Sequence, residues 1–147
     1  MKDELRHLIG CGKYSEAYEL IKDVDREELL DWTLELAYNT ESIEYYAFVS
    51  SLIVKHEEAT FHCIASHLMS LPLCSIDGAY NVGFYHAKRA VELSPEDASF
   101  KEHLLFYHAI PDKLLSDEEA EKIAKSILEM EPDNQTAKKH LRLIRRD

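Results

Sequence analysis

The chain contains an internal repeat, and this repeat limits the fold more than any other feature of the sequence. Residues 86–106 align with residues 123–143 at an offset of 37 residues, and seven of the 21 aligned positions are identical. The identical pairs are Ala87/Ala124, Lys88/Lys125, Glu92/Glu129, Pro95/Pro132, Lys101/Lys138, His103/His140 and Leu104/Leu141. A repeat of this length is typical of helical arrays, in which each unit covers the apolar face of its neighbour.

Each copy of the repeat is interpreted as two helices that meet at a proline. Ala87 and Ala90 belong to an apolar stripe with the i, i+3, i+4 spacing of a helix. Pro95 is expected to end that helix and to open the next one, because its ring fixes φ near the helical value and the first helical position needs no amide donor. Ser94 is the predicted N-cap, and Pro132 has the same place in the second copy.

Composition extends this interpretation to the whole chain. The 147 residues include only four Gly and four Pro, which leaves little room for the turns of an all-β protein. We therefore predict an all-α fold, a single domain over residues 1–147, in which about nine helices form antiparallel pairs. The clearest repeats span 78–109 and 116–146, and degenerate pairs span 2–71. The expected helices cover residues 2–9, 14–24, 26–38, 42–54, 57–71, 78–93, 95–109, 116–130 and 132–146.

Local signals mark several helix ends. Asp25 and Ser116 are predicted N-caps, and each is followed three residues later by a glutamate, as in a capping box. The first helix is expected to end at Gly10-Cys11-Gly12, because glycine accepts the left-handed backbone of a helix C-cap. These signals support helices rather than strands on both sides of each break.

Charge and cysteine content limit the partners and the compartment. The net charge of −11 disfavours nucleic acid, because phosphate binding needs a surface of Lys and Arg, and it also disfavours anionic membranes. A basic protein partner is compatible with this charge. No apolar run is long enough for a membrane span or a signal peptide. The odd, unpatterned set Cys11, Cys63 and Cys74 indicates reduced thiols in a cytoplasm.

Two short motifs resemble tetratricopeptide repeats. Residues 12–17 (GKYSEA) match the Gly-x-Tyr-x-x-small motif that begins the second helix of that family's helix pair, and residues 78–83 (GAYNVG) match it again. Further positions of the family pattern are matched by Ala87, Ala90, Pro95, Ala120, Ala124 and Pro132. The resemblance covers residues 12–17 and 78–143, and over residues 26–71 only the rhythm of helix pairs remains.

The resemblance implies a short right-handed superhelix whose concave groove binds a peptide or a partner helix. The first helix of each pair would line that groove. Mapped onto this chain, the resemblance implies a partner-binding set composed of Glu102, His103, Phe106, Lys139 and His140. The alternative is that these positions belong to a terminal helix pair that covers the core and meets solvent.

The sequence carries no motif for catalysis, and we expect neither a metal nor a cofactor. Cys63 and His67 are four residues apart and share a helix face, as zinc ligands can, but no paired motif supplies the remaining ligands. Cys11 lies between two glycines and is interpreted as part of a helix cap and turn. Phosphate-binding, dinucleotide-binding and Gly-x-Ser-x-Gly motifs are all missing from the sequence.

These observations favour a non-enzymatic, cytoplasmic interaction module that holds a protein or peptide in a helical-repeat groove. An alternative is a small acidic inhibitor or immunity-type protein that blocks a basic partner such as a nuclease or toxin. A metalloenzyme built on Cys63 and His67 is a third hypothesis, and self-assembly into a homodimer is a fourth. The identity of the partner does not follow from the sequence.

Overall fold

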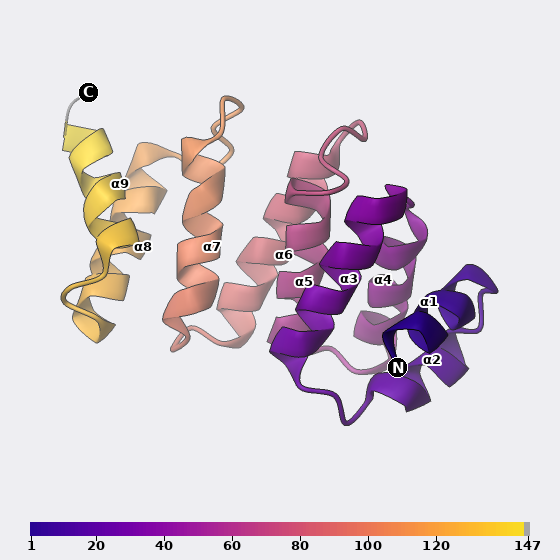
Figure 1. Ribbon diagram of the computed structural model, residues 1–147. Helices are drawn as coiled ribbons and strands as arrows, with labels where there is room; N and C mark the ends of the chain where they lie inside the picture. The colour runs from indigo at the N-terminus through magenta and orange to yellow at the C-terminus, as the bar shows by residue number, and fades with distance from the viewer. Residues whose placement is uncertain (146–147) are drawn as a thin grey trace. The chain divides into compact units, whose positions relative to one another are not determined.

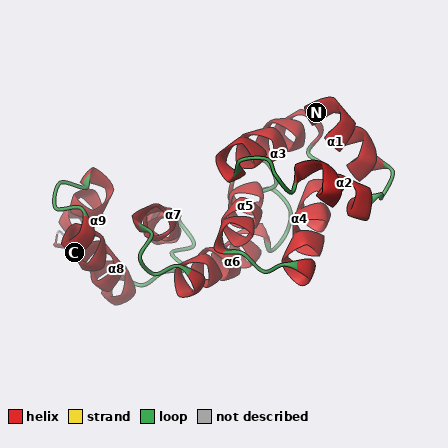
Figure 2. Cartoon of the chain, turned by 90° about the horizontal axis from the view of Figure 1, so that it is seen from below, coloured by secondary structure: helices red, strands yellow, loops and turns green. Residues whose placement is uncertain are grey.

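The computed structural model describes residues 1–145, and every regular element in this range is a helix (Figures 1 and 2). The nine helices of this range are α1 (Lys2–Gly10), α2 (Tyr14–Ile21), α3 (Arg26–Thr40), α4 (Glu44–Lys55), α5 (Ala59–Ser70), α6 (Ala79–Leu93), α7 (Ala98–Ala109), α8 (Asp117–Met130) and α9 (Gln135–Arg145). The predicted all-α fold is therefore confirmed.

The chain divides into two compact units, Met1–His86 and Ala87–Asp147, with the boundary inside α6. The single domain expected over residues 1–147 stays a prediction. The larger core belongs to the first unit, and helices α7, α8 and α9 belong to the second.

In the first unit, α4 is the central element. The α1–α2 hairpin packs against α4, and α3 and α5 also pack against it (Figure 1). Phe48 of α4 and Phe61 of α5 are fully buried, and Tyr14 meets Phe48 edge-to-face with ring centroids 5.6 Å apart. Each such side chain contributes about 1.5–3 kcal/mol through removal of apolar surface from water.

In the second unit, α8 packs against both α7 and α9. Ala120 and Ala124 of α8 and Ala137 of α9 are fully buried. Because interaxial distance depends on the side chains at the contact, these alanines allow the helices to approach closely. The identity of Ala87 and Ala124 in the repeat fits this requirement, since both are buried.

The prediction that Pro95 and Pro132 open helices is wrong. Both prolines lie in a short turn, and Ser94, the predicted N-cap, follows the end of α6. The caps are instead Asp97, whose Oδ1 accepts a hydrogen bond from the amide two residues on, and Asn134, whose Oδ1 accepts one from the amide three residues on. Both bonds are 2.9 Å long. The two caps are 37 residues apart, which is the offset of the repeat. Both copies of the repeat therefore form a capped corner between their two helices.

Other predicted helix ends agree with the structure more closely. Asp25 Oδ2 accepts hydrogen bonds from two amides in the first turn of α3, at 3.2 and 3.3 Å, and Ser116 Oγ accepts one from α8 at 3.2 Å. After α1, the left-handed residue is Gly12, with φ of +70°, whereas Gly10 still belongs to the helix. The turn therefore begins later than the sequence predicts, because the amides of Cys11 and Gly12 still bond to carbonyls of α1.

Candidate functional sites: two buried histidine pairs and a cationic pocket

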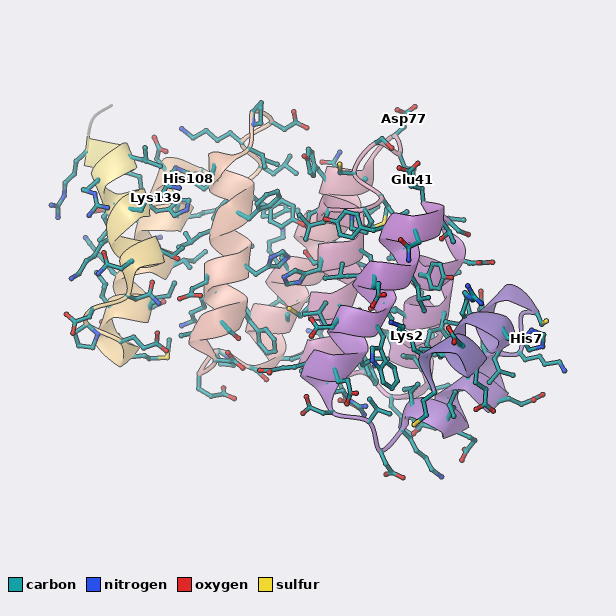
Figure 3. The ribbon with its side chains drawn as sticks, viewed as in Figure 1. Lys2, His7, Glu41, Asp77, His108 and Lys139 are labelled. Carbon is teal, nitrogen blue, oxygen red and sulfur yellow. The ribbon has the colours of Figure 1, made fainter. Side chains whose placement is uncertain are left out.

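The residues expected to bind a partner lie in different environments. His103 and Phe106 are half-buried on α7, with ring centroids 6.3 Å apart and planes at 8° to each other. Glu102 on the same helix accepts a hydrogen bond from the side-chain amide that caps α9. Lys139 is exposed on α9 (Figure 3), whereas His140 beside it is buried. The partner-binding role of these five residues stays a prediction.

His140 belongs to a buried histidine pair in the second unit. Its Nδ1 lies 2.9 Å from Nδ1 of His108 on α7. Nε2 of His108 lies 2.7 Å from Oδ1 of Asp117, the first residue of α8, and the same carboxylate pairs with Lys113 at 2.8 Å. A carboxylate and two imidazoles therefore connect α7, α8 and α9 (Figure 3 shows His108).

The first unit contains a second pair of the same kind. Nδ1 of His62 on α5 lies 2.9 Å from Nδ1 of His86 on α6. Nε2 of His62 lies 2.9 Å from Oε2 of Glu57, and Nε2 of His86 lies 2.8 Å from the hydroxyl of Tyr46 on α4. The resulting chain of carboxylate, imidazole, imidazole and phenol connects α4, α5 and α6.

The proton positions in these chains follow from the groups at their ends. A carboxylate only accepts, so Nε2 of His62 donates to Glu57, and a neutral His62 then has a bare Nδ1. His86 must therefore donate from its own Nδ1, which leaves its Nε2 to accept from the hydroxyl of Tyr46. The same argument assigns the proton between His108 and His140 to His140. Each pair holds one proton between its rings and has no room for a second.

Burial keeps the second histidine of each pair uncharged. Burial, with a smaller contribution from the nearby His62, lowers the pKa of His86 to about 4. Burial likewise lowers the pKa of His140 to about 4, with smaller contributions from His108 and Lys139. At neutral pH these two rings therefore act as hydrogen-bonding groups of the core and not as charges.

Sequence reasoning missed both pairs. The partners are 24 and 32 residues apart and lie on different helices, so no spacing within one helix could reveal them. The available signal was compositional, because eight histidines in 147 residues make it more probable that some are buried and paired.

Cys63 and His67 share a helix face, as predicted, but the geometry does not activate the thiol. Nδ1 of His67 lies 2.8 Å from the carbonyl oxygen of Cys63 and 3.5 Å from its Sγ. The short contact requires a proton on Nδ1, so this nitrogen cannot accept the proton of the thiol. Burial lowers the pKa of His67. In the part of the chain that the structure describes, no three His, Cys, Asp or Glu side chains are arranged to hold a metal ion.

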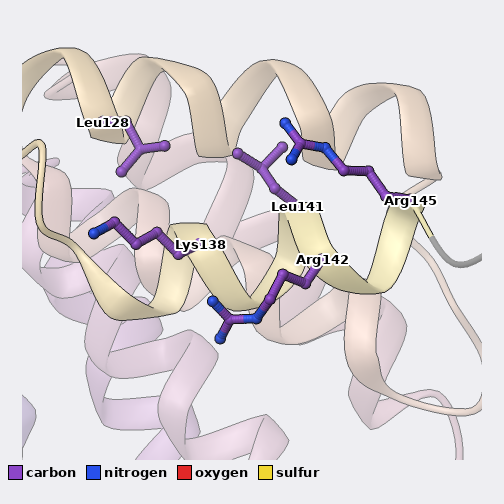
Figure 4. Close-up of a pocket in the computed structure, with 5 residues that line it drawn as sticks. All are labelled: Leu128, Lys138, Leu141, Arg142 and Arg145. Atoms are coloured by element: carbon purple, nitrogen blue, oxygen red, sulfur yellow. The ribbon is translucent and has the colours of Figure 1, made fainter.

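A pocket of about 250 Å³ lies between α8 and α9 (Figure 4). The residues that line it are Leu128 of α8 and Lys138, Leu141, Arg142 and Arg145 of α9. The four α9 residues have i, i+3, i+4, i+7 spacing and so form one stripe of that helix. Leu128 and Leu141 both point into the space between the helices, and Arg145 lies beside Leu141, whereas the side chain of Arg142 extends away from α8. The pocket therefore combines an apolar contact surface with positive charge.

Within residues 1–145, no helix is long and apolar enough to cross a membrane. Comparisons with protein-family models, with curated proteins and with solved structures give no match. The functional interpretation therefore rests on the geometry and chemistry of the chain itself.

Proposed function

We propose that this protein is a non-enzymatic interaction module that binds a peptide or a partner protein. The observation that carries the proposal is the pocket between α8 and α9, where apolar and cationic side chains meet at the surface. Protein interfaces use this combination, because an apolar contact supplies binding energy and surrounding charges supply orientation and specificity.

The environments of the reactive side chains also favour binding over catalysis. Four histidines are buried and hydrogen-bonded in two pairs, His62 with His86 and His108 with His140. Their rings therefore do not meet a substrate from solvent. The carbonyl contact of His67 removes the base that the thiol of Cys63 would need. These four histidines thus contribute to the core, which supports a binding role over a catalytic one.

The proposal includes a short right-handed superhelix of the tetratricopeptide-repeat type. Its support is the helical fold, the two Gly-x-Tyr motifs and the corner at which Asp97 and Asn134 each cap the following helix through Oδ1, at equivalent repeat positions. A cytoplasmic location is part of the proposal, and it is supported by Cys11, Cys63 and Cys74, which form no disulfide with one another.

Affinity capture with the tagged protein as bait tests the proposal. An Arg142→Gln/Arg145→Gln variant removes two cations from the pocket, and a Lys13→Gln/Lys22→Gln variant makes the same change in net charge in the first unit. We expect one stoichiometric partner with the wild type and with the Lys variant, and none with the Arg variant. Equal capture by all three proteins would contradict a role for the pocket, and no partner at low or high salt would contradict the proposed function.

An acidic inhibitor of a basic protein is the second candidate, and the surface of α3 favours it. Four exposed acidic residues follow one side of this helix: Glu27, Glu28, Asp31 and Glu35. A basic partner held there would be lost from a Glu28→Gln/Asp31→Asn variant and retained by the Arg142→Gln/Arg145→Gln variant. Its capture would also weaken steeply with salt, since charge steering is screened.

A further inference from the structure

We infer that the α8–α9 pocket binds an acidic segment of a partner protein, with one apolar side chain of the segment between Leu128 and Leu141 and its carboxylates against Lys138, Arg142 and Arg145. This inference rests on the proposed function and names the chemistry of the partner. It also differs from the expectation of a basic partner, which considered only the net charge of the chain.

The first argument for an acidic ligand is the distribution of charge along the chain. The chain has a net charge of −11, yet α9 contains no acidic residue between Gln135 and Arg145 and has four cationic ones. At physiological salt the Debye length is about 8 Å, so the acidic surface of more distant helices is largely screened at the pocket. α8 also carries acidic residues, but the residues that line the pocket include three cations and no carboxylate, so a ligand in the pocket meets positive charge at close range.

The helix dipole accounts for only part of this charge. Arg142 and Arg145 lie in the last turn of α9, where cations complement the negative end of the dipole. Lys138 lies in the first turn, where the dipole disfavours a cation. Its carboxylate neighbour, Asp133, lies 3.7 Å away with a fully exposed side chain, so that ion pair is weak. The cationic stripe is therefore longer than helix stability requires.

The arginines keep their donors available for a ligand. Among the residues that the structure describes, neither Arg142 nor Arg145 has a carboxylate within ion-pair distance. A guanidinium presents a planar fork of donors that matches a carboxylate in a bidentate manner. Two arginines three residues apart can therefore bind two carboxylates at neighbouring positions of one segment.

The size and lining of the pocket favour a protein segment over other anions. A volume of about 250 Å³ is below the range of roughly 300–1,000 Å³ that is usual for small-molecule sites, and it accommodates a side chain. The leucines favour an apolar side chain, whereas single-stranded nucleic acid is bound by aromatic side chains on which bases stack. The net charge of −11 also repels an extended polyanion more than a short peptide.

The test uses the full-length protein and three fluorescein-labelled octapeptides in a polarisation titration. The first peptide is EDLEELDE, the second is its uncharged counterpart QNLQQLNQ, and the third, EDSEESDE, replaces the leucines by serine. We expect the first peptide to bind with a Kd of roughly 100 µM, because exposed ion pairs and one apolar contact are individually weak. We expect at least about tenfold weaker binding of the other two peptides.

Protein variants locate the binding. Arg142→Gln/Arg145→Gln should weaken binding of EDLEELDE at least about tenfold, while Lys13→Gln/Lys22→Gln should leave it within about twofold. Circular dichroism and the melting temperature show whether each variant is folded. Because the arginines are exposed, we expect both variants to fold. Raising the salt from about 0.1 M to 1 M, which shortens the Debye length from about 10 Å to 3 Å, should abolish the binding.

Four positive results would overturn the inference, as would the absence of binding described below. They are equal binding of the charged and uncharged peptides, equal binding by both variants, tighter pocket-dependent binding of a (dT)12 oligonucleotide, and arginine-dependent self-association in sedimentation, which would make a second copy the occupant. If EDLEELDE does not bind up to millimolar concentration while the capture experiment yields a pocket-dependent partner, this inference fails and the proposed function stands. Failure of both experiments would reject both.

Discussion

At the scale of single residues, the two buried histidine pairs differ from ordinary core contacts. The hydrogen-bonding groups next to each pair fix the positions of its protons. The carboxylate of Glu57 requires a proton on Nε2 of His62, and with both imidazoles neutral this determines every later proton up to the hydroxyl of Tyr46. We expect ¹⁵N NMR at pH 7.5 to show His62 as the Nε2–H tautomer and His86 as the Nδ1–H tautomer. The same spectrum should show His140 as the Nδ1–H tautomer. A His86 ring protonated on Nε2 alone would contradict this hydrogen-bond direction.

The hydroxyl of Tyr46 gives a second prediction. Tyr46→Phe keeps the ring and removes the donor, so Nε2 of His86 becomes a buried acceptor without a partner. We expect the free energy of unfolding, measured with urea, to fall by about 1–3 kcal/mol. Tyr38→Phe is the matched control, because Tyr38 is 55% exposed, and it should stay within about 0.5 kcal/mol of the wild type. Equal effects of the two changes would show that the hydroxyl of Tyr46 has no special role.

At the scale of elements, α8 depends on small side chains where it packs against α7 and α9. Ala124 has no exposed surface, so Ala124→Asp would place a charge without a partner in that contact. We expect a loss of about 3 kcal/mol or more in the free energy of unfolding. Lys122→Asp introduces the same side chain at an exposed position of α8 and should cost less than about 1 kcal/mol. Thermal melting of both variants measures the difference, and wild-type melting of Ala124→Asp would reject this packing.

The helices could be predicted because their signals are local. Periodic apolar residues located all the helices of residues 1–145, and Asp25 and Ser116 cap where the sequence places them. The corner was predicted wrongly because Pro95 is itself acceptable at a helix start, so the pattern alone could not select Asp97. A carboxylate or amide side chain two residues later supplies the cap that the proline lacks.

The histidine pairs and the pocket could not be predicted, because both depend on how separate helices pack. His62 and His86 lie on different helices, and only their packing brings the two Nδ1 atoms to 2.9 Å. Likewise, the cations of α9 were visible in the sequence as a complement to the helix dipole, whereas Leu128 comes from α8 and completes the pocket. The structure thus places positive charge at this pocket, although the chain as a whole has a negative net charge.

For the whole molecule, the buried histidines determine how stability depends on pH. The pKa of His86 and that of His140 are about 4 in the folded protein, against an ordinary value near 6.5 in the unfolded chain. The unfolded state therefore binds protons more tightly, so stability is complete above about pH 6.5 and is lost as the pH falls toward 4. Integrating between pH 7 and pH 5 gives a loss of about 2 kcal/mol for each ring.

Two other effects change with pH and must be separated from this one. Protonation reduces the net charge of −11, and the smaller self-repulsion favours the folded state. The pKa of the Asp117 carboxyl is lowered by Lys113 and His108, so its contribution is lost only below about pH 4. The interval between pH 5 and pH 6.5 therefore reports mainly on histidines.

A pH series of urea unfolding curves tests this dependence. We expect the wild type to lose about 3–4 kcal/mol between pH 7 and pH 5, the two rings together less the gain from reduced self-repulsion. A His86→Gln/His140→Gln variant has lower stability at pH 7 but retains a neutral donor and acceptor at both positions, so it should lose much less stability than the wild type over the same interval. The lowered pKa of His67 accounts for part of the loss that remains. His7→Gln, at an exposed position of α1, should keep the wild-type slope. If the double variant is as acid-sensitive as the wild type, the lost stability comes from other groups, and the two pairs do not control the response of the molecule to acid.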